Sequence, residues 1–409
     1  MRTQPIIVTI TNMKRYWLGL ILIIGFGLRL WRLGIPASYI FDEVYHVPSL
    51  RAFSQNNPAA FDVYAKAPEP NTAYDWLHPP LAKLFQAGSV LVFGDNSFGW
   101  RFPAAVFGTL AVAAVYYLAL VVTKKTNIAL LAALLFSLDN LQLTMSRIAM
   151  NDIFVTAFIL STLALFYKKS WFWAAVFTGL AISTKHSAAL LYPIFAIQGR
   201  SLFTDKVRPF QKLSLFFLPP LIYLLSFSQF WLQGHTWQQF VDLHKQIYYY
   251  QTHLTATHSY QSAAWQWPLL VRPVWFYVQY FPDKIANIYN LGNPLIFWGG
   301  LIALLQQGRS LFTDKVRPCQ AGFLLLAFLG LWLPFLASPR IMFLHHYLPA
   351  LAVLTVILAE WLWQTKNKLL ITVYLLLVTF SFLFFYPLNT AIPLPADWLK
   401  YWFLLPSWR

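Results

Sequence analysis

Two adjacent acids, Asp42 and Glu43, are the residues whose types and placement most clearly suggest chemistry. They directly follow the first long apolar segment of a chain that has only 14 Asp and Glu among 409 residues. A carboxylate beside a membrane-spanning segment is costly unless it is used. Neighbouring residues in a turn point in different directions, so the pair does not fit a hydrolase with two facing carboxylates. We expect one acid to act and the other to orient it; the alternative is that both are solvated in a loop.

Basic residues supply the opposite charge. Five of them lie at ends of apolar segments, away from the basic clusters of the chain. Cations in such positions usually face the interior of a helix bundle and mark ligand pathways, and phosphate is a natural partner of Arg. Any one of them alone could instead extend toward lipid headgroups. Together they predict an anion pocket, and the five are Arg29, Arg101, Arg147, Lys185 and Arg340.

A third feature is the motif His78-Pro79-Pro80, downstream of the acids. Paired prolines hold an extended turn and would position His78 ahead of a short apolar helix. A metal site is a less favoured alternative, because no dense cluster of carboxylates or of His and Cys occurs at ligand spacing. The single cysteine, Cys319, excludes an intramolecular disulfide and a Cys-based zinc site.

The composition defines the environment of these residues. Hydrophobic residues make up 58% of the chain and charged residues only 11%, against about 25% charged in ordinary soluble domains. The chain is therefore expected to be an all-α polytopic membrane protein. In that setting the net charge of +16 reports topology and does not indicate a nucleic-acid partner.

Apolar stretches predict about eleven transmembrane helices. The basic clusters fall on one side, which the positive-inside rule makes the cytoplasm, and the N-terminus, interpreted as a retained signal-anchor, lies there too. Two long loops, 35–97 and 233–290, are then extracytoplasmic and should carry interfacial helices, one of them over Leu81 to Gly94. The expected spans are 16–34, 98–122, 127–146, 152–167, 171–185, 186–198, 214–232, 291–307, 320–338, 341–363 and 369–387.

An eleven-residue segment occurs twice, identically, at 199–209 and 308–318. Two predicted spans separate the copies, so both fall in cytoplasmic loops. The favoured interpretation is a duplicated basic loop at the inner leaflet, because the positive-inside rule accounts for its charge.

Across nearly its whole length the chain resembles the protein O-mannosyltransferase family, which uses lipid-linked donors. The block Phe41 to His46 is similar to the acidic loop motif of that family, and His78 to Lys83 to its His-Pro-Pro-Leu-Gly-Lys motif, with Ala82 in place of Gly. Two other departures are His186 for Trp and Ser259 for Pro. Further matching blocks are Asp139-Asn140, Ser146-Arg147, Asn151-Asp152, Ser183 to His186, His258 to Ser262, Trp267-Pro268, Arg272 to Val274, Gly292 to Pro294 and Arg340 to Pro349.

The resemblance implies a GT-C glycosyltransferase fold in one domain, 1–409, with a four-helix membrane region at 291–409. No inserted soluble repeat domain is present, as in bacterial-type members. The implied reaction is inverting transfer of a hexose, mannose in this family, from a polyprenyl-phosphate carrier to Ser or Thr hydroxyls of secreted or membrane proteins.

The resemblance also implies roles for residues. Asp42 would be the base, with Glu43 beside it as the second member of the catalytic pair, and cations would stabilise the leaving phosphate. Asp152 is either part of the site or a structural partner of Arg147. The donor-phosphate ligands would be Arg29, Arg101, Lys185, Arg147, Arg340 and His346, and the sugar or acceptor would contact His78, Lys83, His258 and Trp267.

The expected partners are the lipid-linked donor, membrane lipids and an acceptor polypeptide, which could emerge from the secretion machinery. No cofactor is firmly implied. The expected location is the plasma membrane, with the site on its extracytoplasmic face. Two alternatives stay open: the same chemistry with a lipid or cell-wall glycan as acceptor, and a transporter or flippase for a lipid-linked sugar. The transporter would predict repeated halves with broken helices, and the sequence has no such symmetry.

Overall fold

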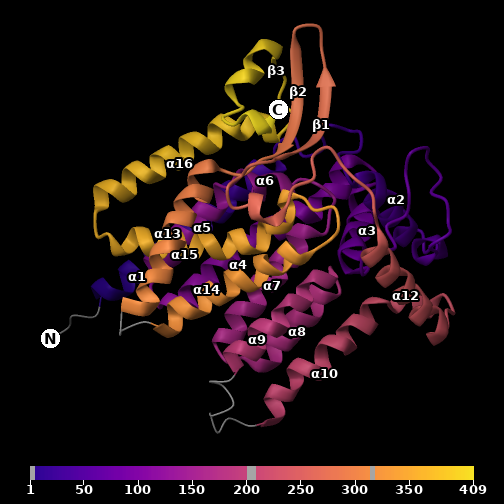
Figure 1. Ribbon diagram of the computed structural model, residues 1–409, viewed down its shortest axis with the longest axis horizontal. Helices are drawn as coiled ribbons and strands as arrows, with labels where there is room; N and C mark the ends of the chain where they lie inside the picture. The colour runs from indigo at the N-terminus through magenta and orange to yellow at the C-terminus, as the bar shows by residue number, and fades with distance from the viewer. Residues whose placement is uncertain (1–4, 200–208, 314–317) are drawn as a thin grey trace.

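The computed structural model describes residues 5–199, 209–313 and 318–409; nine of the eleven residues of the first copy of the repeated segment and four of the second lie outside them. Helices dominate the described chain, and they form a bundle with a smaller region of short helices, loops and strands at one end (Figure 1). The first helix, α1 (Pro5–Leu30), includes residues 16–30 of the predicted first span 16–34 and ends four residues before it.

Four stretches of helix among the described residues are long and apolar enough to cross a membrane. They are α4 (Ser97–Thr123), α14 (Pro318–Trp332) with the short 3-10 helix η4 (Leu333–Ala337), η5 (Leu344–Tyr347) with α15 (Leu348–Gln364), and α16 (Lys368–Asn389). Six shorter apolar helices or helix segments accompany them. The fold class agrees with expectation, whereas the count of eleven spans stays a prediction.

The core of the bundle forms where small residues allow close packing. Helix α4 packs on α5 (Thr126–Ser137) and α7 (Asp152–Tyr167), and α15 packs on α5 and on α13 (Pro294–Thr313). Five alanines of α4 are buried: Ala104, Ala105, Ala111, Ala114 and Ala119. Beside α7 stand α8 (Trp171–Ile182) and then α10 (Pro209–Ser226).

Several predicted spans are interrupted in the structure. The span 127–146 divides into α5 and α6 (Asn140–Met145), because the Asp139 carboxylate accepts a hydrogen bond from the Gln142 backbone and starts a new helix. The span 186–198 begins as η2 (His186–Leu190) before α9 (Leu191–Gly199). The span 214–232 ends in the short α11 (Ser228–Leu232).

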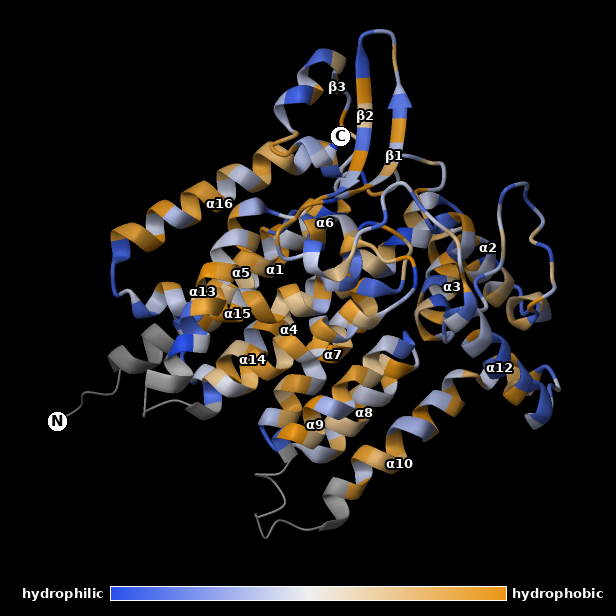
Figure 2. Cartoon of the chain, in the orientation of Figure 1, coloured by the Kyte–Doolittle hydropathy of each residue, from blue (hydrophilic) through white to orange (hydrophobic). Residues whose placement is uncertain are grey.

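The two predicted long loops build the polar region, which holds α2 (Glu43–Ser54), η1 (Pro58–Phe61), α3 (Leu81–Phe93), α12 (Trp237–His253) and η3 (Ala264–Gln266). Helix α3 matches the short helix expected over Leu81 to Gly94. In Figure 2 hydrophilic colour gathers on the loops and α12, the strands carry both colours, and the bundle helices are mostly hydrophobic. Two short 3-10 helices, η6 (Ala396–Tyr401) and η7 (Pro406–Trp408), end the chain.

The mostly helical fold includes one small sheet that the sequence did not predict. Strands β1 (Val274–Tyr280) and β2 (Lys284–Asn290) form an antiparallel hairpin with a bulge between Trp275 and Tyr277, and β3 (Leu394–Pro395) pairs with β2. The hairpin projects from the bundle in Figure 1. The segment is rich in aromatic and β-branched residues, which favour strands, but its short strands lie in a loop for which only interfacial helices were expected.

Candidate functional site

The hairpin of the second loop fixes the backbone that presents Asp42. The Phe41 amide donates to the Phe276 carbonyl on β1 at 3.2 Å, and the two rings stack with centroids 4.4 Å apart. Phe41 has φ +46°, an unusual conformation for a bulky residue. Asp42 then starts α2 as its N-cap, with its carbonyl accepting from the Tyr45 and His46 amides. The two loops, which are far apart in the chain, thus jointly fix the position of Asp42.

The Asp42 carboxylate is half-buried, and we find no hydrogen bond or ion pair from it to any side chain or amide that the structure describes. Burial raises its pKa to about 6. Positive charge on His46 and Lys185 opposes this shift, whereas the carboxylates of Asp75 and Asp152 add to it. A carboxylate with a pKa near neutrality and free lone pairs is suited to accept a proton.

Asp75 gathers three basic side chains on the His-Pro-Pro side of the site. Its carboxylate accepts from His78 Nδ1 at 2.8 Å and from Lys83 Nζ at 2.5 Å, and His46 Nδ1 lies 3.1 Å away. Burial would raise the pKa of Asp75, but His78, Lys83 and His46 outweigh it and hold that pKa well below its usual range. Lys83 is fully buried, so it orients Asp75 and has no surface for a sugar or an acceptor.

His78 is the member of this group with an open side. Its side chain is about a quarter exposed (25%), and burial lowers its pKa. A neutral His78 donates from Nδ1 to the carboxylate, because an ionised carboxylate only accepts. Its Nε2 is then left as a hydrogen-bond acceptor for a hydroxyl group.

A second acid–base pair lies between α7 and α8. Lys185 Nζ donates to the Asp152 carboxylate at 2.7 Å, so Asp152 pairs with Lys185 and not with Arg147, the partner that had been considered for it. The rings of His345 and His346 stack on each other, and Trp267 lies parallel to His346 with centroids 6.0 Å apart. The electrostatic influence of both histidines on Asp152 indicates that they lie near this pair.

Glu43, the other acid of the pair, is enclosed by protein. It is fully buried, and its two oxygens accept from Arg101 Nε at 2.8 Å and Nη2 at 2.7 Å. The amides of Ile40 and Ala149 also donate to it, each at 2.9 Å. Arg101 is buried too, and its remaining donors reach the carbonyls of Leu33, Pro36 and Ser38. The pair therefore binds the start of α2 to α4 and to the loop after α1.

Two more of the predicted phosphate ligands, Arg147 and Arg29, donate hydrogen bonds to groups of the protein itself. Arg147 caps the end of α1 by donating to the carbonyls of Leu28, Arg29, Trp31 and Arg32. The Arg29 side chain is buried and donates to the Gly25 carbonyl and the Gln142 side chain. The role of both in binding phosphate stays a prediction, and their hydrogen bonds favour a structural role.

Two predicted residues flank the site on the side of the second loop. The exposed His258 ring lies 6.0 Å from that of Phe41 and 5.1 Å from that of Phe343. Arg340 lines a cavity of about 530 Å³ between residues 254–266 and 335–342.

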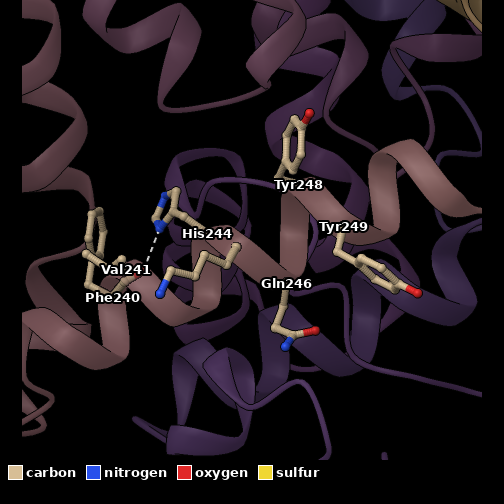
Figure 3. A pocket seen from close by; sticks show the side chains of 7 residues that line it. Phe240, Val241, His244, Gln246, Tyr248 and Tyr249 are labelled. Atoms are coloured by element: carbon tan, nitrogen blue, oxygen red, sulfur yellow. Dashed lines mark hydrogen bonds between the residues drawn. The ribbon is translucent and has the colours of Figure 1, made fainter.

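Figure 3 shows a second hollow, of about 610 Å³, on α12. His244 lines it and donates from Nδ1 to the Phe240 carbonyl at 2.7 Å. Its Nε2 accepts from the Tyr223 hydroxyl at 2.6 Å, and that hydroxyl lies 3.0 Å from His186 Nε2. This chain of hydrogen bonds fastens α12 to α10 and to η2, next to Lys185.

The sequence-based list of site residues omitted His46, Asp75 and His345, and left Asp152 undecided. Asp75 could have been found, because it is one of few acids in the chain and stands three residues before His78. His46 and His345 lie in blocks that the sequence already singled out. Nothing in the sequence pairs Asp152 with Lys185, since 33 positions separate them.

Comparison with known proteins identifies the family to which the chain is similar. Residues 19–243 match the family model described as dolichyl-phosphate-mannose-protein mannosyltransferase, and residues 236–408 match the C-terminal four-transmembrane region of protein O-mannosyltransferase. The chain is 26% identical to a polyprenol-phosphate-mannose–protein mannosyltransferase of Corynebacterium glutamicum, covering 90% of this chain and 88% of that protein. It is 23% identical to one from Mycobacterium tuberculosis, with coverages of 97% and 92%.

Solved structures resemble the fold as a whole. The Saccharomyces cerevisiae protein O-mannosyltransferase Pmt1-Pmt2 complex bound to the sugar donor superposes with a TM-score of 0.80 at 15% identity, covering 97% of this chain and 93% of that one. ArnT from Cupriavidus metallidurans bound to undecaprenyl phosphate gives 0.59 at 13% identity, with coverages of 85% and 60%. At these identities the likeness establishes the GT-C fold and no more.

Proposed function

Because the chain belongs to the dolichyl-phosphate-mannose-protein mannosyltransferase family, we propose that it transfers mannose from polyprenyl-phosphate-mannose to Ser or Thr hydroxyls of proteins. Relatives that align over nearly their whole length carry this activity in their names. The observation that supports it most is the half-buried Asp42 carboxylate, which has a pKa of about 6 and no partner among the described residues.

In the proposed reaction Asp42 takes the proton of the acceptor hydroxyl as the oxygen attacks the anomeric carbon of mannose. The new bond forms on the face opposite the phosphate, and the bond from that carbon to the phosphate oxygen breaks. The electron pair leaves with the polyprenyl phosphate, so the configuration inverts in one step. A phosphate is a stable anion, so no general acid is needed.

The leaving phosphate requires positive charge, which Lys185 is proposed to supply; His346 is a second proposed ligand, which adds charge only when its ring is protonated. Lys185 is held by Asp152 at 2.7 Å yet stays partly exposed, and His346 lies beside it by the electrostatic link of both to Asp152. With this charge in place the reaction as written needs no metal ion. The Nε2 of His78 is the proposed acceptor for a hydroxyl of the sugar or the protein, and His258 closes the side at Phe41.

The chain is a multi-pass membrane protein, as the family and the apolar helices establish. We place the reaction at the extracytoplasmic face of the plasma membrane, because the basic clusters favour a cytoplasmic location for the opposite ends of the spans. There the donor lipid would enter from the bilayer and the acceptor polypeptide from the aqueous side.

The test is mannose transfer from polyprenyl-phosphate-mannose to a Ser/Thr peptide by the purified full-length protein. We expect transfer by the wild type and a loss of about a hundredfold or more in Asp42→Asn, in line with general-base catalysis. Equal rates would remove Asp42 from the mechanism. Donor consumption with a lipid or glycan acceptor but with no peptide would change the acceptor class, and donor movement across vesicles without sugar transfer would point to a transporter.

A further inference from the structure

The cavity beside Arg340 has the chemistry of a polypeptide site. Its polar lining includes Thr255, Thr257, Gln261, Ser262 and Ser338. At about 530 Å³ it falls within the range of ligand pockets, roughly 300–1,000 Å³. One cation, Arg340, is added to these neutral groups, so a ligand with hydrogen-bonding groups and one negative charge is the best match.

The Arg340 guanidinium is unengaged. We find no hydrogen bond or ion pair from it within 5–199, 209–313 and 318–409, and its Nε is buried without a partner. A buried hydrogen-bond donor that has no acceptor lowers the stability of the fold. The Nε of Arg29 also lacks a partner among the described residues, but the terminal nitrogens of Arg29, Arg101 and Arg147 bind carbonyls or side chains of the protein, which those of Arg340 do not. A group that completes the hydrogen bonds of Arg340 is thus expected from outside the chain.

Backbone groups in the cavity wall favour a polypeptide over a sugar or a lipid. Residues 254–257 and 339–342 have no regular secondary structure. The amides of Thr255, Ala256 and Thr257 make no hydrogen bond to an acceptor that the structure describes. Unpaired backbone along a cleft is what binds an extended peptide, through main-chain hydrogen bonds.

The cavity also adjoins the proposed catalytic residue. The Ser262 amide donates to the Met342 carbonyl at 2.8 Å, and the next residue, Phe343, touches the Phe41 ring with centroids 5.4 Å apart. Asp42 follows Phe41 directly. Phe343 is three residues beyond Arg340, so the two lie at most about 10 Å apart along the chain, the length of about three residues of an extended bound peptide.

We propose that this cavity is the subsite for the acceptor polypeptide, and that Arg340 binds an acidic side chain about three residues from the hydroxyl that is mannosylated. The proposal rests on the proposed function for the identity of the acceptor. It reassigns Arg340 from the donor phosphate to the acceptor. The charge-assisted contact gives the enzyme a preference for acidic flanking sequence.

The test uses matched peptides with one Ser and either Glu or Gln three positions before or after it, and the full-length wild type, Arg340→Gln and Arg340→Lys. We expect the wild type to show an acceptor KM roughly tenfold lower for a Glu peptide, a typical effect of one charge-assisted contact. Arg340→Gln abolishes the difference, Arg340→Lys keeps part of it, and the donor KM stays constant. Lys245→Gln removes an exposed cation of α12 and serves as the control.

Three results would overturn the proposal: no discrimination by the wild type, discrimination that survives Arg340→Gln, or a rise in donor KM in place of the acceptor effect. Binding of fluorescent peptides without donor separates it from the proposed function. Glu-dependent binding that needs Arg340, with no mannose transfer, supports the subsite and contradicts the function. Mannose transfer without a preference for Glu supports the proposed function and contradicts the subsite. If Arg340→Gln does not fold, the binding comparison with Arg340→Lys decides.

Discussion

Asp42 and Glu43 are neighbours in the chain, yet they lie in opposite environments. Glu43 is fully enclosed and receives hydrogen bonds from Arg101 and two backbone amides. Asp42 is half-buried, without a described partner, and its pKa is raised to about 6 by burial. The Glu43 carboxylate is thus paired with Arg101 and stabilises the fold, whereas the Asp42 carboxylate is able to accept a proton.

The cations divide in the same way. Arg101 and Arg147 bind backbone carbonyls at the end of α1 and in the loop after it, and these contacts hold the scaffold. Lys185 and Arg340 keep exposed surface beside the site or its adjoining cavity. Cations at the boundary of the membrane bundle therefore either stabilise the scaffold or remain available to a ligand. Only the groups that each cation contacts distinguish these two roles.

The largest expected effect is on the structural side of this comparison. Glu43→Gln removes the negative charge from a buried pair and leaves Arg101 uncompensated, which costs about 3–5 kcal/mol. We expect a large loss of thermal stability and of folded yield in detergent. Arg51→Gln, which breaks partly exposed pairs with Glu69 and Asp95, is the control and should cost about 1 kcal/mol or less per pair.

The next effect is on the catalytic side. Lys185→Gln removes the proposed phosphate cation and should lower kcat by about a hundredfold, as for the loss of one donor to a developing anion. Lys245→Gln breaks an exposed Lys–Asp pair on α12 and should leave the rate within about twofold. A normal rate in Lys185→Gln would confine that residue to a structural role like that of Arg101.

The pH dependence should follow Asp42. Because burial raises its pKa to about 6, the carboxylate holds its proton at lower pH and becomes a base as the pH rises through 6. We expect kcat/KM to fall about tenfold per pH unit below 6 and to level off above it. A break near pH 4, the ordinary range of an exposed Asp, would contradict the buried environment of Asp42.

The smallest effect tests how the hairpin positions Asp42. Phe276→Leu removes the stacking partner of Phe41 and should cost about 1 kcal/mol of stability while lowering the rate a few-fold, because the turn before Asp42 loosens. Phe384→Leu disrupts a stacked pair with Trp402 elsewhere in the fold. Its stability loss should be similar, with an unchanged rate per folded molecule. A rate loss of equal size in both variants would argue against a positioning role.

Much of the fold follows from hydropathy, because long apolar runs such as those of α4 and α16 have few alternatives to a helix. The interruption at Asp139 was missed, since a single N-cap inside an apolar run changes the mean hydropathy little. The hairpin was missed because its aromatic strands look like interfacial structure. Its role in holding Phe41 depends on a contact between residues 235 positions apart, which local pattern does not reveal.

Residues of the site could be predicted where their type is rare in the chain. Asp42 stood out because acids are scarce in an apolar chain, and His78 because of its prolines. The roles of the cations were not predictable, since Arg101 and Lys185 have the same charge and similar positions at the ends of spans. What separates them is the group each one meets, a buried carboxylate with three carbonyls or an Asp at the edge of a partly open site.

The most direct test of the account is the rate of mannose transfer per folded molecule in Asp42→Asn and Glu43→Gln, measured side by side with the wild type. We predict that Asp42→Asn folds normally and loses about a hundredfold or more in rate. Glu43→Gln should fold poorly, while its folded fraction keeps the greater part of the activity. A Glu43→Gln fraction that is well folded and inactive, beside an active Asp42→Asn, would contradict the account.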